Sequence, residues 1–221
     1  MQATKQPRVK ICCIASREEA NLAIEYGAAA RGLVSAMPSG PGVIREEQIA
    51  EIAASVPPPI ATFLLTSSQD ADGIIAQQRR CGANTIQIVD RFLGSYEKLR
   101  TALPGIAIVQ VVHVTGGSSV EEAIGLAPHV DAILLDSGNP ALVKKELGGT
   151  GRRHDWNLSR KIREEIDVPI FLAGGITPAN VREAVEDVGP FGLDICTGVR
   201  TDGLLDRTKL RALFDNLAVP L

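Results

Sequence analysis

Short apolar runs alternate with amphipathic stretches along the whole chain. The apolar runs are continuous rather than alternating with polar residues, which is typical of strands buried on both faces of a parallel sheet. The pattern predicts eight such strands, at residues 9–15, 31–35, 60–66, 85–89, 107–114, 132–136, 169–173 and 192–197.

A helical pattern follows each predicted strand. The expected helices cover residues 17–26, 45–56, 71–81, 96–102, 120–127, 158–166, 177–188 and 208–217. Gly27 and Gly82 follow two of these helices, where glycine commonly ends a helix. Three prolines at 57–59 stop another, because proline has no amide hydrogen to continue it.

Eight strand–helix pairs without a change in composition predict a single (β/α)8 TIM barrel that covers residues 1–221, with 1–8 as an N-terminal extension. A length of 221 residues suits one such barrel. A doubly wound open sheet is the alternative. It usually has fewer strands, and no dinucleotide-binding fingerprint follows the first strand here.

Composition narrows the classes of partner. The formal net charge is -3, there is no basic block, and only 4% of residues are aromatic, so nucleic acid is not an expected partner. No apolar run is long enough to cross a bilayer, and the first residues lack the apolar segment of a signal peptide. We therefore expect no membrane partner and a cytoplasmic protein.

The cysteines and histidines do not indicate a metal. The four cysteines include no C-x-x-C pair and fit a reducing compartment, and the three histidines lack metal-ligand spacing. We expect no structural metal.

In a barrel the chemistry lies at the carboxyl ends of the strands, which singles out Cys12, Asp136 and Asp194. Cys12 shares strand parity with Lys10, and a nearby lysine favours a thiolate. A thiolate and a carboxylic acid could serve as base and acid on a sugar. Cys12 could equally be a small buried apolar residue, and Asp136 could cap the turn at 137–139. A charge in an apolar run needs compensation, which favours a pocket role for Asp194.

Three glycine-containing turns are candidate anion sites, because glycine lets backbone amides approach a ligand closely. One follows the seventh strand and precedes the helix expected from Thr177, whose first amides would favour a phosphate. A plain flexible loop is the alternative for the turn in the long sixth loop. The expected phosphate-binding residues are Gly149, Thr150, Gly151, Gly174, Gly175, Thr197 and Gly198.

These motifs resemble those of one family, phosphoribosylanthranilate isomerase of tryptophan biosynthesis, from about residue 9 to 214. The similar segments are VKIC at 9–12, LLD at 134–136, GGTG at 148–151 with DW at 155–156, AGGI at 173–176 with Pro178 and NV at 180–181, and LD at 193–194 with TGV at 197–199. Each motif is modest alone, but five in the right order make a specific match.

The resemblance implies an intramolecular oxidoreductase that catalyses an Amadori rearrangement, in which an N-substituted phosphoribosylamine becomes a 1-amino-1-deoxyribulose 5-phosphate. In that scheme Asp136 is the general acid and Cys12 the general base, and no cofactor or metal is needed. The implied partner is a phosphorylated sugar-amine. The family includes monomers and dimers, so a homodimer is one of two expected states.

Four positions depart from the family pattern. Cys13 replaces a glycine after the catalytic cysteine, Gly42 stands at the position of an arginine that holds the anthranilate carboxylate, Val89 replaces a pocket histidine, and Arg200 replaces a glutamate. The other end of the substrate is therefore expected to be bound differently.

The residues expected to contact substrate are Lys10, Gln87, His113, Asp194 and Arg200. For His113 and Arg200 the alternatives are a partly exposed strand end and a solvent-facing side chain. Three functions stay open: the family's isomerase, a divergent member that isomerises a different sugar phosphate, and a non-catalytic barrel that binds a phosphorylated metabolite.

Overall fold

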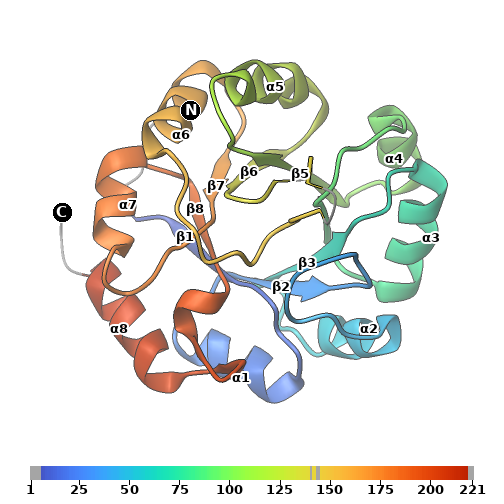
Figure 1. Cartoon of the computed structure of the whole chain (residues 1–221). Coiled ribbons are helices and arrows are strands. Elements are labelled where there is room, and N and C mark those ends of the chain that lie inside the picture. Colours follow the sequence, from blue (N-terminus) through green and yellow to red (C-terminus); the bar gives the residue numbers. More distant parts are fainter. Residues whose placement is uncertain (1–5, 140, 143–144, 219–221) are drawn as a thin grey trace.

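In the computed structural model, which describes residues 6–139, 141–142 and 145–218, eight parallel strands close into a barrel in the order of the sequence. Helices surround this barrel, and Figure 1 looks down its axis. The predicted (β/α)8 fold is therefore confirmed. The strands are β1 (Arg8–Ile11), β2 (Ala30–Val34), β3 (Ala61–Thr66), β4 (Thr85–Ile88), β5 (Ala107–His113), β6 (Ala132–Asp136), β7 (Ile170–Leu172) and β8 (Gly192–Ile195).

The helices follow the strands one by one, and several have N-terminal caps that their sequence explains. Ser16, Asp70, Ser95 and Asp155 each accept a hydrogen bond from an amide in the first turn of the helix that follows. The helices are α1 (Arg17–Glu25), α2 (Glu46–Ala54), α3 (Ala71–Cys81), α4 (Tyr96–Ala102), α5 (Ser118–Leu126), α6 (Trp156–Glu165), α7 (Val181–Val188) and α8 (Arg207–Ala218).

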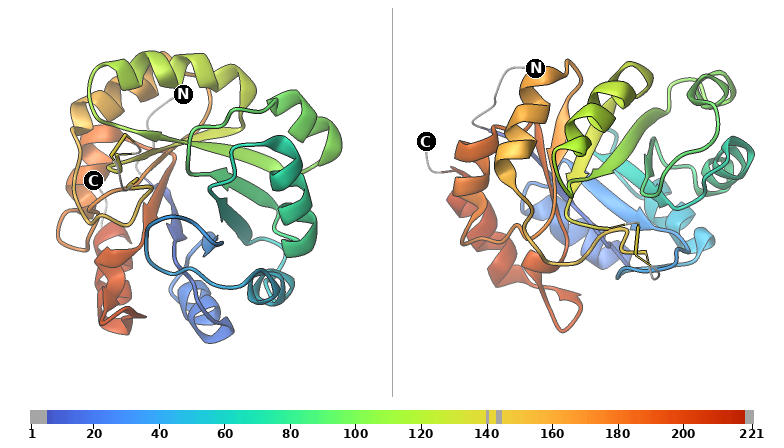
Figure 2. Two further views of the ribbon diagram at one scale, coloured as in Figure 1. Left: turned by 45° about the vertical axis from the view of Figure 1, so that its right-hand side comes forward. Right: turned by 45° about the horizontal axis from the view of Figure 1, so that its top comes forward.

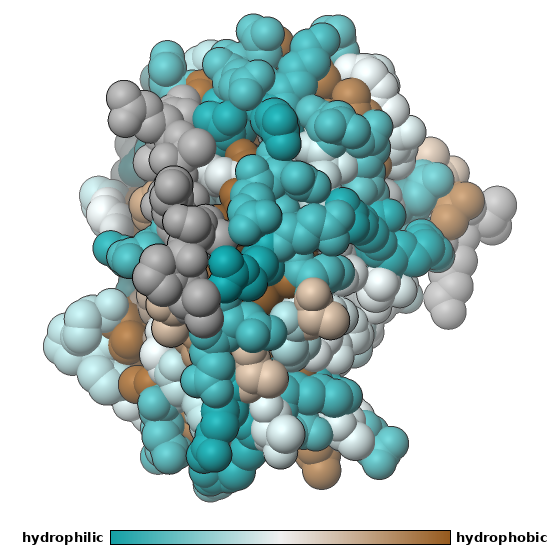
Figure 3. All heavy atoms as spheres, turned by 90° about the vertical axis from the view of Figure 1, so that its left-hand side faces the viewer, coloured by the Kyte–Doolittle hydropathy of each residue, from teal (hydrophilic) through white to brown (hydrophobic). Residues whose placement is uncertain are grey.

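The apolar side chains form two layers. One lies between the strands and the helices and includes Ile11, Leu33 and Ile195. The other fills the inside of the barrel and includes Phe63, Val109 and Phe171. The face of the molecule shown in Figure 3, which is the left-hand side of Figure 1, is mostly hydrophilic. No helix among the described residues is long and apolar enough to cross a membrane.

Several predicted bounds differ by one or two residues, and the two largest errors have local causes. The first strand ends at Ile11 rather than at residue 15, because Cys13 has a φ of 62°, which a strand cannot accommodate. The seventh helix begins at Val181 rather than at Thr177. There the side chain of Asn180 accepts a hydrogen bond from the Thr177 amide at 2.8 Å and donates to the Gly175 carbonyl at 2.9 Å, which closes a turn ahead of the helix.

Four short elements were not predicted. The 3-10 helices η1 (Ala127–His129) and η2 (Thr197–Val199) follow α5 and β8. A two-stranded hairpin of β9 (Arg200–Thr201) and β10 (Leu204–Leu205) then leads into α8. Such short elements carry no periodic pattern that a sequence could reveal.

Candidate active site

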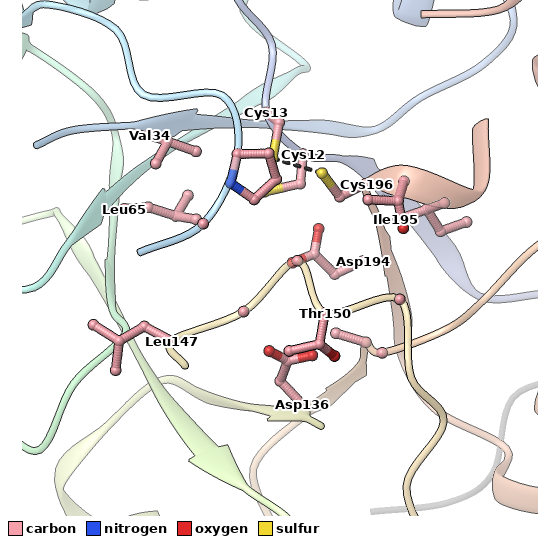
Figure 4. Close-up of a pocket in the computed structure, with 18 of the residues that line it drawn as sticks. Cys12, Cys13, Val34, Leu65, Asp136, Leu147, Thr150, Asp194, Ile195 and Cys196 are labelled. Carbon is pink, nitrogen blue, oxygen red and sulfur yellow. Dashed lines mark hydrogen bonds between the residues drawn. The ribbon is translucent and has the colours of Figure 1, made fainter. Parts of the chain in front are cut away.

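A pocket opens at the carboxyl end of the barrel, and its walls bring the two predicted catalytic residues together. Cys12 follows β1, Asp136 ends β6, and both line this pocket with Asp194 of β8. In Figure 4 the side chain of Asp194 lies between the sulfur atoms and Asp136. The barrel thus places a thiol and two carboxyl groups around one space.

Cys12 sits in surroundings that favour its thiolate. A Cβ on Gly32 would lie 2.6 Å from Cys12 Sγ and 2.9 Å from Lys10 Nζ, so both groups occupy the space that the missing side chain leaves. Hydrogen bonding from the Cys13 thiol lowers the pKa of Cys12; burial and the charge of Asp194 oppose this effect, and Lys10 assists it. The net direction is downward, which suits a base.

Lys10 and Asp194 form a buried ion pair across the β1–β8 seam, where they are register partners. Lys10 Nζ lies 2.7 Å from Asp194 Oδ1, and the side chains are 0% and 7% exposed. Burial would lower the pKa of Lys10, but the charges of Asp194 and Cys12 outweigh it and the pKa is raised. Lys10 therefore stays protonated behind the pocket wall. The prediction of a direct substrate contact for Lys10 does not match this placement.

Asp136 has the opposite tendency to that of Cys12. Its carboxyl group is buried, and burial raises its pKa, although the charge of His113 and the Ser137 amide act against this. A raised pKa favours the protonated carboxyl group, which can donate a proton. The pocket therefore combines a thiol that tends to lose its proton with a carboxyl group that tends to keep one.

The predicted glycine turns meet along one rim of the pocket. A Cβ on Gly174 would lie 2.8 Å from Ser137 Oγ, and one on Gly151 would lie 3.6 Å from Thr197 Oγ1. The hydroxyl groups of Ser137 and Thr150 are 2.8 Å apart. The turns after β6, β7 and β8 thus form one continuous surface, and all seven predicted phosphate-binding residues line the pocket, namely Gly149, Thr150, Gly151, Gly174, Gly175, Thr197 and Gly198.

The start of α7 contributes differently from the prediction. The amide of Thr177 is already bonded to Asn180, so it is not available to an anion. Next to α7, the candidate donors to an anion are the backbone amides of the Gly174–Gly175 segment and those of η2, which follows β8. This barrel fold frequently builds its phosphate site from such loops and a short extra helix.

Gln87 and His113 face the inside of the barrel from neighbouring strands β4 and β5. Gln87 is 3% exposed and lines the pocket, and its buried Oε1 has no hydrogen-bond partner within the part of the chain that is described. The His113 Nε2 lies 2.9 Å from the Val89 carbonyl oxygen. Gly138 covers the other ring nitrogen, since a Cβ there would lie 2.5 Å from it. Gln87 can therefore reach a ligand, whereas His113 is enclosed and does not match the predicted substrate contact.

Arg200 does not match its predicted substrate contact either. Its guanidinium pairs with Glu19 of α1 at 2.7 Å, and it also donates to the backbone carbonyl groups of Cys12 and Cys13. The side chain is only 7% exposed and lies outside the pocket lining. Arg200 thus holds the segment that carries Cys12 and Cys13.

Cys13 and Gly42 occupy adjoining space. A Cβ on Gly42 would lie 2.5 Å from Cys13 Cβ and 2.9 Å from its Cα, and Gly42 has a φ of 77°. The backbone of Cys13 is also left-handed, which explains why a glycine would suit position 13. The Cys13 side chain therefore leaves no room for a larger residue at 42.

Loops from opposite sides meet above the pocket. Ser39, between β2 and α2, donates through Oγ to the Lys145 carbonyl at 2.5 Å and accepts from the Leu147 amide at 3.3 Å. Figure 2 shows the loop after β6, in yellow, beside the blue loop after β2. Ser39 and Leu147 also line the pocket, and sequence reasoning missed both because nothing local marks a contact between residues so far apart.

A candidate metal centre does not emerge from the residues that the structure describes, where no group of three or more His, Cys, Asp or Glu side chains could hold an ion. The ionisable side chains that line the pocket include those of Cys12, Asp136 and Asp194, which can act as acids and bases. The class of protein defined by this fold and site is a (β/α)8-barrel enzyme of acid–base chemistry.

Comparison with known proteins gives the family. The model of the family described as N-(5'phosphoribosyl)anthranilate (PRA) isomerase matches residues 9–216. The chain belongs to this family.

Relatives and solved structures agree over nearly the whole chain. An N-(5'-phosphoribosyl)anthranilate isomerase from Haloferax volcanii is 35% identical, with 93% of this chain and 90% of the relative covered. A second relative, isomerase 2 from Methanosarcina mazei, is 34% identical, with 92% and 90% covered. The structure of phosphoribosyl anthranilate isomerase from Thermotoga maritima has a TM-score of 0.79 and 28% identity, with 96% of this chain and 98% of that chain covered. The protein is thus an isomerase that performs the family's Amadori rearrangement.

Proposed function

We propose that this isomerase opens and rearranges an N-substituted 5-phosphoribosylamine with Asp136 as the general acid and Cys12 as the general base. The observation that carries the proposal is that these two residues, with opposite pKa shifts, line one pocket beneath a rim of glycine turns. A similar solved structure, with a TM-score of 0.77 and 26% identity, is an isomerase in complex with reduced 1-(o-carboxyphenylamino)-1-deoxyribulose 5-phosphate.

In the proposed reaction, the protonated Asp136 donates its proton to the furanose ring oxygen. The C1–O bond breaks, and the lone pair of the substrate nitrogen forms a C=N bond to C1. The Cys12 thiolate then removes the proton from C2, and the electron pair of that C–H bond forms an enolamine. Its tautomerisation gives the 2-ketone. The substrate nitrogen accepts the electrons, so the side chains need only move protons.

Binding of the substrate is assigned to the two ends of the pocket. The phosphate would accept hydrogen bonds from the turn amides at 149–151, 174–175 and 197–198. The unpartnered Oε1 of Gln87 would accept a hydrogen bond from the sugar or from the bridging N–H. Asp194, held by Lys10, would contact the sugar hydroxyl groups.

Turnover of N-(5'-phosphoribosyl)anthranilate, generated in the cuvette and followed by the loss of its fluorescence, tests this proposal. Wild type should turn it over, while Cys12→Ala and Asp136→Asn should not. Cys81→Ala is the matched control, because Cys81 is a buried thiol in α3, away from the pocket. Failure of the folded wild type, or unchanged turnover in either variant, would refute the roles given to these residues.

A second candidate is a substrate whose nitrogen carries a substituent other than the carboxyphenyl group of anthranilate. The packing of Gly42 against Cys13 favours this candidate. The pocket lining contains no lysine or arginine among the residues described. A comparison of kcat/KM for phosphoribosylanthranilate and for the phosphoribosylaniline that lacks the carboxylate tests this. A preference for the aniline compound would favour the second candidate.

We also propose that residues 1–221 form one domain, and that the protein is cytoplasmic and can form a homodimer. The four free cysteines support a reducing compartment. A similar structure from Thermotoga maritima, 25% identical, concerns monomers generated from a dimeric isomerase. Light scattering over a range of protein concentrations would determine the assembly.

A further inference from the structure

Two thiols that the proposed reaction does not use meet at the edge of the pocket. Cys196 follows β8 and Cys13 follows β1, and their Sγ atoms are 2.6 Å apart. The dashed line in Figure 4 marks this contact. Both residues line the pocket, and Cys196 is partly exposed whereas Cys13 is buried. An oxidant can therefore reach one member of the pair while the second thiol lies in contact behind it.

The distance favours a bond between these sulfurs. Their separation is only about half an ångström more than the ~2.05 Å of a disulfide. Hydrogen bonding to Cys12 and Cys196, together with burial, raises the pKa of Cys13. Cys196 is the more exposed of the two and is therefore the thiol that meets an oxidant first. Cys13 is also the chain neighbour of Cys12, the proposed base, and hydrogen bonding from its thiol lowers the pKa of that residue.

We propose that Cys13 and Cys196 are a redox modification site that forms a reversible disulfide and thereby lowers activity. The oxidant is a low-molecular-weight disulfide, R–S–S–R. The Cys196 thiolate attacks one of its sulfurs, which breaks the R–S–S–R bond and releases R–S⁻, and R–S⁻ takes up the proton that Cys196 lost. The Cys13 sulfur then attacks the Cys196 sulfur as its own S–H bond breaks, and the second R–S⁻ leaves and takes up that proton.

The electrons and protons balance. Two protein thiols are oxidised to one disulfide, and the oxidant is reduced to two thiols that carry the two protons. The consequence for the site follows from what Cys13 loses. Once its sulfur is bonded to Cys196 it has no S–H to donate, so the Cys12 thiolate loses a hydrogen-bond donor. Loss of a bond to a charged group corresponds to roughly tenfold or more in activity.

The test uses the purified full chain in mixtures of glutathione and glutathione disulfide. Samples are quenched in acid, alkylated in denaturant, digested and mapped by tandem mass spectrometry. Activity is measured in parallel. As the disulfide fraction rises, a Cys13–Cys196 cross-link should appear while kcat/KM falls roughly tenfold or more. Dithiothreitol should reverse both changes.

Variants separate this site from direct modification of Cys12. Cys196→Ser should give no cross-link and keep its activity in glutathione disulfide, and Cys81→Ala should respond like wild type. Cys13→Gly should also lose the cross-link, and it should fold because the φ of 62° suits glycine. Inhibition that persists in Cys196→Ser, or a cross-link that persists in Cys13→Gly, would assign the chemistry to Cys12 and overturn the proposal.

The activity arm rests on the proposed function, whereas the peptide map needs no substrate. A reduced wild type without turnover would refute the proposed function, and the map would still decide whether the disulfide forms. Absence of the cross-link in an active wild type would refute the thiol pair alone.

Discussion

The two walls of the pocket differ in how they keep the family pattern. The wall formed after β6, β7 and β8 retains the glycine turns, which pack against one another and against Ser137 and Thr197. The opposite side, after β1, β2 and β4, carries three of the departures: Cys13 lines the pocket, Gly42 packs against Cys13, and Val89 is buried inside the barrel. The side proposed to bind the phosphate therefore keeps the motifs that resemble the family, whereas the opposite side departs from them.

The largest expected effect comes from removing the one reactive group that each wall contributes. Cys12→Ala and Asp136→Asn should each lower kcat by about 10²–10⁴-fold, the usual contribution of a general acid or base. The steady-state rate at which substrate fluorescence is lost measures kcat. If both variants stayed within tenfold of wild type, neither wall would carry the chemistry.

The free energy of unfolding gives a second test of the role assigned to Asp136. Burial raises the pKa of Asp136 in the folded state, so ionisation above that pKa destabilises the fold. Asp136→Asn removes this penalty, and its unfolding free energy at neutral pH should equal or exceed that of wild type, with a smaller advantage at lower pH. Urea unfolding at two pH values measures the difference, and a less stable Asp136→Asn protein at neutral pH would contradict the assigned burial cost.

The next largest effect is expected at the seam between β1 and β8, where Lys10 and Asp194 form their ion pair. Lys10→Met leaves the Asp194 carboxylate buried without its partner, which typically costs about 3–5 kcal/mol. Lys10→Met/Asp194→Leu removes both charges and should recover most of that loss. Urea unfolding of the single and double variants provides the comparison. Recovery of less than half would mean that the pair itself, rather than its completeness, stabilises the seam.

A smaller effect on stability is expected from the contact between Gly42 and Cys13. Gly42→Ala places a methyl group against Cys13 and should cost about 1–3 kcal/mol by overpacking. In a Cys13→Gly background the contacts with Cβ and Sγ vanish, so the cost should fall by at least about 0.5 kcal/mol. Unfolding free energies of the four proteins complete the double-mutant cycle. Simple additivity would show that the two departures arose independently of each other's packing.

The smallest expected effect concerns the pH profile. Cys13 lowers the pKa of Cys12, and the thiolate is the active form, so activity rises as pH increases through that pKa. Cys13→Gly should move this acid limb of kcat/KM to higher pH, because the hydrogen bond that lowers the pKa of Cys12 is lost. Cys13→Ser retains a donor and should stay close to wild type. A limb that moves equally in both variants would point to packing instead of hydrogen bonding.

Periodicity predicted most of the fold because every strand is buried on both faces and every helix on one. The bounds of α3, α4 and β6 agree with the predicted ranges. The end of β1 and the start of α7 were wrong because a single residue decides each, through the left-handed backbone of Cys13 and the turn closed by Asn180. Neither changes the apolar pattern on which the predictions depend.

The candidate site also contains residues that could be predicted from the sequence and contacts that could not. Cys12, Asp136, Asp194 and the glycine turns could be predicted because strand ends converge in a barrel. The partner of Arg200 could not, since Glu19 lies 181 residues away. The contact between Cys13 and Cys196, 183 residues apart, is equally invisible before folding. Such pairings exist only once the barrel closes and brings β8 beside β1.

The two hydrogen bonds that Ser39 makes join loops on opposite sides of the pocket mouth. Together they contribute about 1–3 kcal/mol to holding the loop after β2 against the loop after β6. One serine side chain therefore ties the two halves of the barrel together at the end where the strands themselves no longer touch.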